Sequence, residues 1–280
     1  MKRFVRALTK VPIYAFLTAV ALFWLLPSLG LLAASLRTNA DNASTGWWTV
    51  LTKPSQLTFQ NYRALFGAGS AVPHSLVNTV LITVPATLLV LAAGALAAYA
   101  FAWMRFPGRD AVFLVVVGLL VVPLQVALIP VAQLYRHLHL FGRIPGVVLF
   151  HVAFGLPFAI FLLRNFFAGI PSDLLEAARM EGAGELRVFA SVVLPLAYPA
   201  LAALAIFQFL WVWNDLLVAL VFAGPGSAPI TVAIREQTRQ FGSNINVIAP
   251  GAFVSMVVPL IVFFAFQRFF VQGLLAGSDR

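Results

Sequence analysis

Long runs of apolar residues constrain this chain more than any other feature of its sequence. Several of them exceed the roughly 18–20 residues that a helix needs to cross a bilayer. Hydrophobic residues make up 61% of the chain and charged residues only 10%, against about 25% charged in a soluble domain. No stretch alternates like the strands of a membrane barrel, so the spans are expected to be helical. The sequence therefore predicts an all-α polytopic membrane protein.

The apolar runs, taken in order, predict six transmembrane helices. The expected spans cover residues 11–36, 74–103, 111–135, 146–167, 191–222 and 247–271. The first run is longer than the roughly 7–15-residue apolar core of a secretory signal, so we interpret it as a retained span. The predicted organisation is a short N-terminus (1–10), a first helix (11–36), a polar interval (37–73), a five-helix domain (74–273) containing a polar loop (168–190), and a tail (274–280).

The distribution of basic residues predicts the orientation of these helices. Lys and Arg collect on the cytoplasmic side of membrane proteins, most clearly in short loops. With the N-terminus inside, eleven of the 18 basic residues face the cytoplasm and seven face outward. Both termini and the 168–190 loop are therefore expected in the cytoplasm, and the 37–73 interval outside. For that interval an external cap and a surface for a partner are equally good interpretations.

The polar interval at residues 170–196 separates two apolar spans and contains four of the nine acids of the chain: Asp173, Glu176, Glu181 and Glu185. Ser172 is the predicted N-cap of a short helix over about 173–181. Gly182 is its predicted C-terminal cap. A helix this short is marginal alone in water and needs a surface to pack on. We interpret it as a docking element for a soluble protein.

The same residues resemble the EAA loop of ABC-importer permeases. That family pattern is Glu-Ala-Ala, three residues, Gly, nine residues, Ile, one residue and Leu-Pro. It is matched by Glu176, Ala177, Ala178, Gly182, Leu194 and Pro195, with Val192 in place of Ile. The resemblance runs from about residue 61 to 277 and is strongest to the maltose-type carbohydrate permeases. The segment Gln267–Gly277 also resembles the end of those permeases and favours a sugar as cargo.

The resemblance implies a type I importer permease fold and a translocation subunit rather than an enzyme. In that family the loop docks on an ATPase subunit and transmits its closure to the membrane helices. The six matched residues would therefore couple this chain to ATP hydrolysis. The implied partners are a second homologous permease, two ATPase subunits and an extracytoplasmic sugar-binding protein. The complex would import a mono- or oligosaccharide across a bacterial or archaeal cytoplasmic membrane.

The residue inventory argues against most other activities. The chain contains no cysteine, which excludes disulfides and thiol chemistry. None of its lysines follows a glycine, so the phosphate-binding P-loop is absent. No cofactor is expected in this chain, and ATP and Mg would bind to the partner ATPase. His137 and His139 lack a nearby acid and make a poor metal site. The net charge of +9 is scattered over loop ends, so we expect no nucleic-acid partner.

Four residues of the fifth span are candidates for the substrate pathway: Phe207, Trp211, Asn214 and Asp215. Their spacing of i, i+4, i+7 and i+8 predicts that they share one face of a helix. Aromatic rings can pack on a sugar, while an amide and a carboxylate can bond its hydroxyl groups. An ionisable residue within a span is a functional hypothesis by default. The alternative is structural: Asp215 pairs with another helix, and Trp211 anchors the span at the membrane interface.

Three other functions stay open at this stage. The chain could be a permease for a non-sugar solute, or a secondary transporter or channel that works without an ATPase. Such a transporter would use intramembrane charges for ion coupling, and Asp215 alone qualifies. A structural or assembly factor in the membrane would need no acidic docking loop of fixed spacing. Transport that continues without ATP would separate these functions from an ATP-driven importer.

Overall fold

The computed structural model of the chain describes residues 2–240 and 245–275, with side chains for residues 11–237 and 245–267. Every regular element in these ranges is helical, which confirms the predicted all-α fold. Backbone contacts divide the chain into two compact units. The first unit comprises residues 1–73 and 234–256, and the second comprises residues 74–233 and 257–280.

Four helices of the described ranges are long and apolar enough to cross a membrane: Val11–Ser35, Val72–Trp103, Ile144–Phe167 and Ile245–Gln267. They coincide with the first, second, fourth and sixth predicted spans. Two bent helix pairs supply the remaining candidates: Arg109–Leu119 with Leu124–His137, and Glu185–Leu196 with Tyr198–Trp213. If each bent pair counts as one span, the described residues provide up to six spans.

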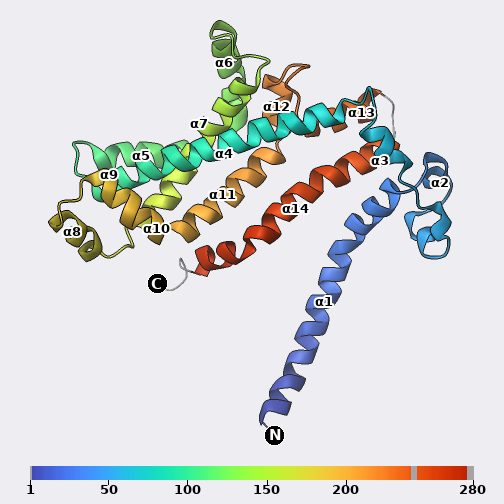
Figure 1. The fold of residues 1–280 in the computed structure, drawn as a ribbon, viewed down its shortest axis with the longest axis horizontal. Coiled ribbons are helices and arrows are strands. Elements are labelled where there is room, and N and C mark those ends of the chain that lie inside the picture. The colour runs from blue at the N-terminus through green and yellow to red at the C-terminus, as the bar shows by residue number, and fades with distance from the viewer. Residues whose placement is uncertain (1, 241–244, 276–280) are drawn as a thin grey trace. The chain divides into compact units, whose positions relative to one another are not determined.

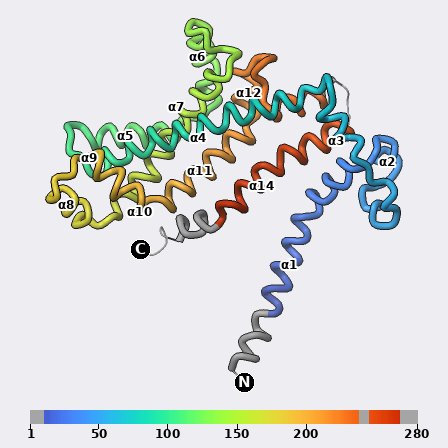
Figure 2. The backbone as a smooth tube through the Cα atoms, viewed as in Figure 1, coloured from blue at the N-terminus to red at the C-terminus, as the bar shows by residue number. Residues whose placement is uncertain are grey.

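The third predicted span, residues 111–135, is wrong as a continuous helix. Helix α5 (Arg109–Leu119) and helix α6 (Leu124–His137) are bent by 100° relative to each other, and the change of direction is visible in Figure 2. Pro123 occupies the N-cap of α6. Proline has no N–H to donate and disfavours helical backbone in the residue before it, so the helix from α5 cannot continue through this position.

The fifth predicted span, residues 191–222, is also interrupted. Helix α10 (Leu194–Leu196) and the residues before it are bent by 78° relative to helix α11 (Tyr198–Trp213). The turn that precedes α10, Phe189–Val193, is π-helical. Pro195 follows this turn and has no N–H to donate to it, so the regular hydrogen-bond ladder cannot pass unbroken. The bend itself falls at Ala197, and Pro199 in the first turn of α11 has no N–H to donate across it to the Pro195 carbonyl.

The first unit holds a compact polar cap at the end of helix α1 (Lys2–Ser35). The cap consists of α2 (Asn39–Ser44), two 3₁₀ turns (Trp47–Leu51 and Pro54–Gln56) and α3 (Gln60–Leu65). The Arg37 guanidinium is fully buried and donates to the carbonyls of Asp41 (2.8 Å) and Thr45 (3.3 Å). The Asn61 side chain donates to the carbonyls of Ser35 (3.0 Å) and Arg37 (2.7 Å). The Asn61 bonds satisfy carbonyls where α1 ends, and the Arg37 bonds satisfy carbonyls of α2 and of its C-cap.

The second unit is built around α7 (Ile144–Phe167), which packs against α5, α11 and α12 (Leu217–Phe222). Helix α4 (Val72–Trp103) also lies close to α7. A Cβ added at Gly94 of α4 would lie 2.9 Å from the Ala159 Cβ of α7. A larger residue at Gly94 would push the two helices apart.

Short helices close the two ends of this bundle. Helices α8 (Ser172–Met180) and α9 (Glu185–Val188) lie at one end, and α12 lies at the other (Figure 1). An apolar core lies at each end: one contains Leu163, Leu175 and Val193, the other Phe150, Val212 and Phe222. Helices α13 (Ile230–Gln240) and α14 (Ile245–Leu275) have residues in both units. Residues 276–280 of the predicted tail lie outside the described residues.

Candidate functional site

The loop between α7 and α11 is anchored at its centre by one residue of α8. Leu175 is fully buried, in the same core as Phe167 and Ile170. Ser172 is not the N-cap that the sequence predicts, because it already has helical backbone and Pro171 occupies the cap position. The Ser172 hydroxyl donates instead to the carboxylate of Asp173 (3.2 Å). The short helix thus gains its stability from the bundle below it.

The C-terminal cap of α8 confirms the predicted role of Gly182. Gly182 has φ +85°, in the left-handed region where glycine is favoured. Its N–H donates to the Arg179 carbonyl (2.9 Å), and the Ala183 N–H donates to the Ala178 carbonyl (3.1 Å). These two bonds form a Schellman motif, which ends the helix and reverses the chain. Gly184 then occupies the N-cap of α9.

The outer surface of this loop is exposed and partly apolar. Glu176 and Ala177 are exposed, and Ala178 is half-buried against the core. Met180 is 89% exposed and Leu186 is 76% exposed. The polar loop therefore exposes two large apolar side chains on its outer surface. The remaining two matched residues lie elsewhere, on α10: Leu194 packs against the core and Pro195 is exposed at the kink.

An ion pair joins the two short helices of the loop. Arg179 of α8 contacts Glu185 of α9 through Nε to Oε1 (2.9 Å) and Nη2 to Oε2 (3.1 Å). The hydrogen bonds with Glu185 raise the pKa of Arg179 above its ordinary value. This bidentate geometry is the more specific form of a salt bridge. It holds α8 and α9 as one hairpin.

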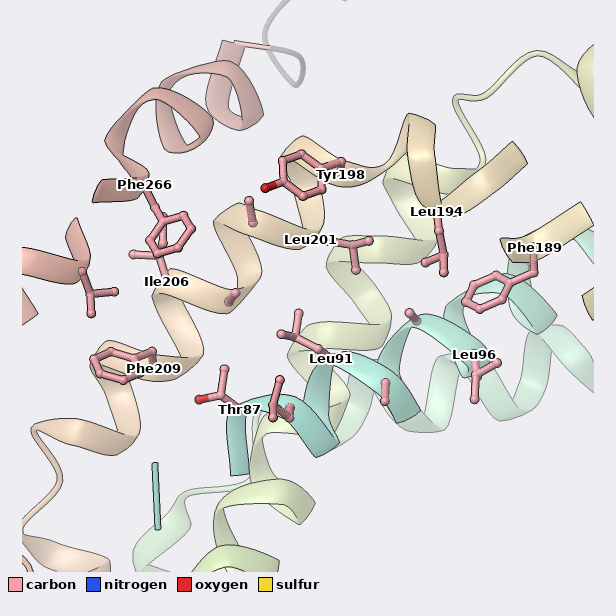
Figure 3. Close-up of a pocket in the computed structure, with 16 residues that line it drawn as sticks. Thr87, Leu91, Leu96, Phe189, Leu194, Tyr198, Leu201, Ile206, Phe209 and Phe266 are labelled. Carbon is pink, nitrogen blue, oxygen red and sulfur yellow. The ribbon is translucent and has the colours of Figure 1, made fainter. Parts of the chain in front are cut away.

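A cavity of about 790 Å³ lies beside this end of the bundle (Figure 3). Its walls come from α4, α11, α14 and the residues that enter α11, and they include Leu91, Phe189, Leu201 and Phe266. Thr87 and Tyr198 contribute the polar side chains. A sugar needs many hydrogen-bond partners, so this cavity does not suit one. None of the four candidate substrate residues lines it.

The four candidate substrate residues do not share one helix face as predicted, because α11 ends at Trp213. Phe207 and Trp211 are about 40% exposed on α11, and Asn214 follows as its C-cap, also exposed. Asp215 turns away from this surface. Its carboxylate accepts from the N–H groups of Val218 (3.2 Å) and Ala219 (3.0 Å) and so caps α12.

Two residues of α7 complete this cluster and were missed from the sequence. His151 is buried, with Nε2 3.6 Å from the Asp215 carboxylate and its ring edge-on to Trp211 at 5.2 Å. Phe158 is exposed and packs edge-on against Phe207 at 6.5 Å. The signal for His151 was a lone histidine in an apolar span. Nothing in the sequence singles out Phe158, because phenylalanine is common in apolar spans.

The exposed aromatic surface therefore consists of Phe158, Phe207 and Trp211, with Asn214 at one end. The Asn214 amide donates to the Leu210 carbonyl (2.8 Å), which leaves its carbonyl oxygen free to accept from a ligand. On the buried side of this surface, the His151 ring packs against Trp211 and lies next to the Asp215 carboxylate. Such an arrangement can hold a flat polar solute against rings.

Several known proteins are similar to this chain. A model of the family described as "Binding-protein-dependent transport system inner membrane component" matches residues 90–275. The osmoprotective compounds uptake permease protein GgtD of Synechocystis sp. is 49% identical over 97% of this chain and 92% of its own length. The alpha-glucoside transport system permease protein AglG of Rhizobium meliloti is 47% identical over 82% of this chain and 62% of its own length. A crystal structure of a bacterial ABC transporter involved in alginate import has a TM-score of 0.80 at 24% identity, covering 94% of this chain and 97% of its own.

The fold is that of a polytopic helical membrane protein with an exposed short helix between two of its candidate spans. The chain belongs to the family of binding-protein-dependent transport system inner membrane components. It is an ABC importer permease, a multi-pass protein of the cytoplasmic membrane, and not an enzyme. ATP hydrolysis belongs to a separate subunit of such a transporter, and the family has no resident cofactor.

Proposed function

We propose that this chain is one of two homologous permease subunits of an importer that moves a neutral sugar inward by alternating access. The observation that most supports an ATP-driven mechanism is the bare surface of α8, where Glu176 and Ala177 are exposed beside a Met180 that is 89% exposed. A soluble subunit that covers this surface would bury the apolar side chains. Two ATPase subunits would bind the two permeases, each at one such loop.

The proposed coupling works through a docked helix. Closure of the ATPase dimer would displace α8, and the buried Leu175 would carry the displacement into the core beneath it. Glu176, Ala177, Ala178 and Gly182 would form the contact with the ATPase. Leu194 and Pro195 would act at the kink that leads into α11. A packed core transmits such shifts because it changes between discrete arrangements rather than deforming continuously.

This role fixes the proposed orientation. The loop would face the cytoplasm together with both termini, as the distribution of basic residues favours. The end that contains α12 would then face outward, where a sugar-binding protein delivers the solute. This placement also puts the 37–73 interval outside.

The proposed cargo is a neutral glucoside. Phe158, Phe207 and Trp211 offer rings for the apolar faces of a sugar, and Asn214 offers an oxygen for its hydroxyl groups. Helix α11 carries no charged residue, so the surface offers no partner for an acidic sugar. Two relatives are described as transporting alpha-glucosides and trehalose. GgtD, described as an osmoprotective compounds permease, favours a small osmoprotective solute as the second candidate.

Replacement of Trp211 by Ala tests the substrate surface. We expect Trp211→Ala to lower solute-stimulated ATPase activity of the reconstituted complex about 5- to 30-fold, since burial of an aromatic ring on a ligand contributes about 1–2 kcal/mol. Assembly should not change, because Trp211 is 39% exposed and lies outside the main cores.

The matched control is Leu149→Ala on α7, which removes a side chain of similar exposure (44%). The assay compares trehalose, another alpha-glucoside, a small osmoprotective solute and an acidic oligosaccharide. Stimulation by the acidic oligosaccharide alone would contradict the proposed cargo. Loss of assembly in Trp211→Ala would favour the structural interpretation of this residue.

A further inference from the structure

Three side chains from three different helices meet at the edge of the loop. Glu185 of α9 accepts two hydrogen bonds from Arg179 of α8 and one from the Tyr99 hydroxyl of α4. Tyr99 is 4% exposed, so the carboxylate reaches from the surface toward a buried donor. A carboxylate with both oxygens bonded in this way is held in one position.

Along the chain, the loop is connected only to α7 and α11. The contacts of Tyr99 and Trp103 connect it to α4 as well. Tyr99 also packs against Phe189, the first residue of the π-helical turn, with ring centroids 5.2 Å apart. One turn further along α4, Trp103 donates from Nε1 to the Phe167 carbonyl (3.2 Å), where α7 ends. Helix α4 is therefore bonded to the loop at the point where the chain enters it and at the point where the chain leaves it.

Apolar packing makes only part of this connection. The 790 Å³ cavity lies between α4 and the residues that follow the loop, with Leu91 and Leu96 of α4 on one side and Phe189 and Leu194 on the other (Figure 3). A gap of about 0.5–1 Å between apolar surfaces already loses about a quarter to a half of their dispersion attraction. The bond between Tyr99 and Glu185 consequently supplies a directional link where side-chain contact is incomplete.

We propose that Tyr99 and Glu185 are positioning residues that carry the movement of α8 to α4. Arg179 holds α8 and α9 together, and Tyr99 attaches this hairpin to α4. The inference rests on the proposed function, because it requires that α8 docks on an ATPase. It adds α4 to the helices that move when ATP is bound.

The two bonds of Glu185 can be separated by mutation. Tyr99→Phe removes the link to α4 and leaves the ion pair between Arg179 and Glu185 in place. Glu185→Leu removes both. If the residues act through one bond, adding Tyr99→Phe to Glu185→Leu has no further effect, which is the non-additivity expected of a shared interaction.

The experiment measures solute transported per ATP hydrolysed by the complete complex in vesicles. We expect this ratio to fall at least about fivefold in Tyr99→Phe, the lower end of ordinary coupling between sites. Binding of the ATPase should stay at the wild-type level, since α8 keeps its exposed surface. A general loss of packing would lower assembly together with transport, whereas loss of the link lowers only the ratio.

Two controls match the changed residues. Tyr135→Phe changes another buried tyrosine. The Tyr135 hydroxyl forms no hydrogen bond within the described residues. Arg187→Gln neutralises an exposed cation of α9 that has no ion pair in the same described part. Both should keep the wild-type ratio. Should Tyr99→Phe assemble poorly, Glu185→Leu removes the same bond from a side chain that is 44% exposed.

The outcomes separate the inference from the proposed function. A wild-type complex that shows no ATP-dependent transport would overturn both. A wild-type complex that couples normally, with Tyr99→Phe and Glu185→Leu at the same ratio, would overturn the inference alone. A lowered ratio in both variants, with the double variant no worse than Glu185→Leu, supports it.

Discussion

Replacement of Gly182 by Trp is expected to reduce transport tenfold or more. Gly182 has φ +85° and forms the turn that ends α8. A residue with a Cβ costs about 1–2 kcal/mol in this backbone conformation. Apart from Gly182 and its two chain neighbours, no atom of the described residues lies within 4 Å of an added Cβ. The indole ring would therefore stand on the surface that we propose for the ATPase. Backbone strain and obstruction therefore act together.

Two smaller changes separate these causes. Gly182→Ala introduces the backbone strain without the ring, and we expect an intermediate loss of transport. Gly184→Ala is the matched control, because Gly184 has φ −71° and equally open surroundings. Transport and ATPase binding at the wild-type level in Gly182→Trp would argue against docking at this surface.

Replacement of Arg37 by Met is expected to loosen the polar cap of the first unit. The Arg37 side chain is fully buried and also donates to the Thr45 hydroxyl, besides the carbonyls of Asp41 and Thr45. Hydrogen bonds from a charged donor contribute about 1.5–3 kcal/mol, and their loss leaves buried acceptors unsatisfied. Hydrogen exchange at residues 38–51 should therefore accelerate about 10- to 150-fold.

The control for this change is Arg63→Met, in helix α3 of the same unit. The Arg63 side chain is exposed and forms no hydrogen bond or ion pair in the part of the chain that the structure describes. We expect its exchange rates to match the wild type. Equal protection of the cap in Arg37→Met and Arg63→Met would show that the buried guanidinium is not what holds it.

The positions of the long helices could be predicted because burial in a bilayer imposes a minimum apolar length. The third and fifth predicted spans are bent helix pairs rather than continuous helices, and the reason is local. Hydropathy does not register that Pro123, Pro195 and Pro199 lack an N–H, although the sequence shows these prolines. The end of α11 was also missed, since Asp215 looks like an intramembrane charge until its carboxylate is seen to cap α12.

The loop was more predictable than the proposed substrate surface. The cap at Gly182 follows from local backbone chemistry, which a short sequence specifies. The pairing of Glu185 with Tyr99 joins residues 86 positions apart, and no pattern in the sequence relates them. His151 and Phe158 lie on a different helix from Trp211 and Phe207, so only the packing of α7 against α11 brings them together.

Cross-linking from Ala177 tests the proposed docking most directly. The chain has no cysteine, so Ala177→Cys provides a single reactive position on the exposed side of α8. In native membranes this cysteine should cross-link to an ATP-binding subunit, with a yield that changes when ATP is added. Labelling of the same cysteine from outside the cell, with no cross-link to an ATPase, would contradict the account.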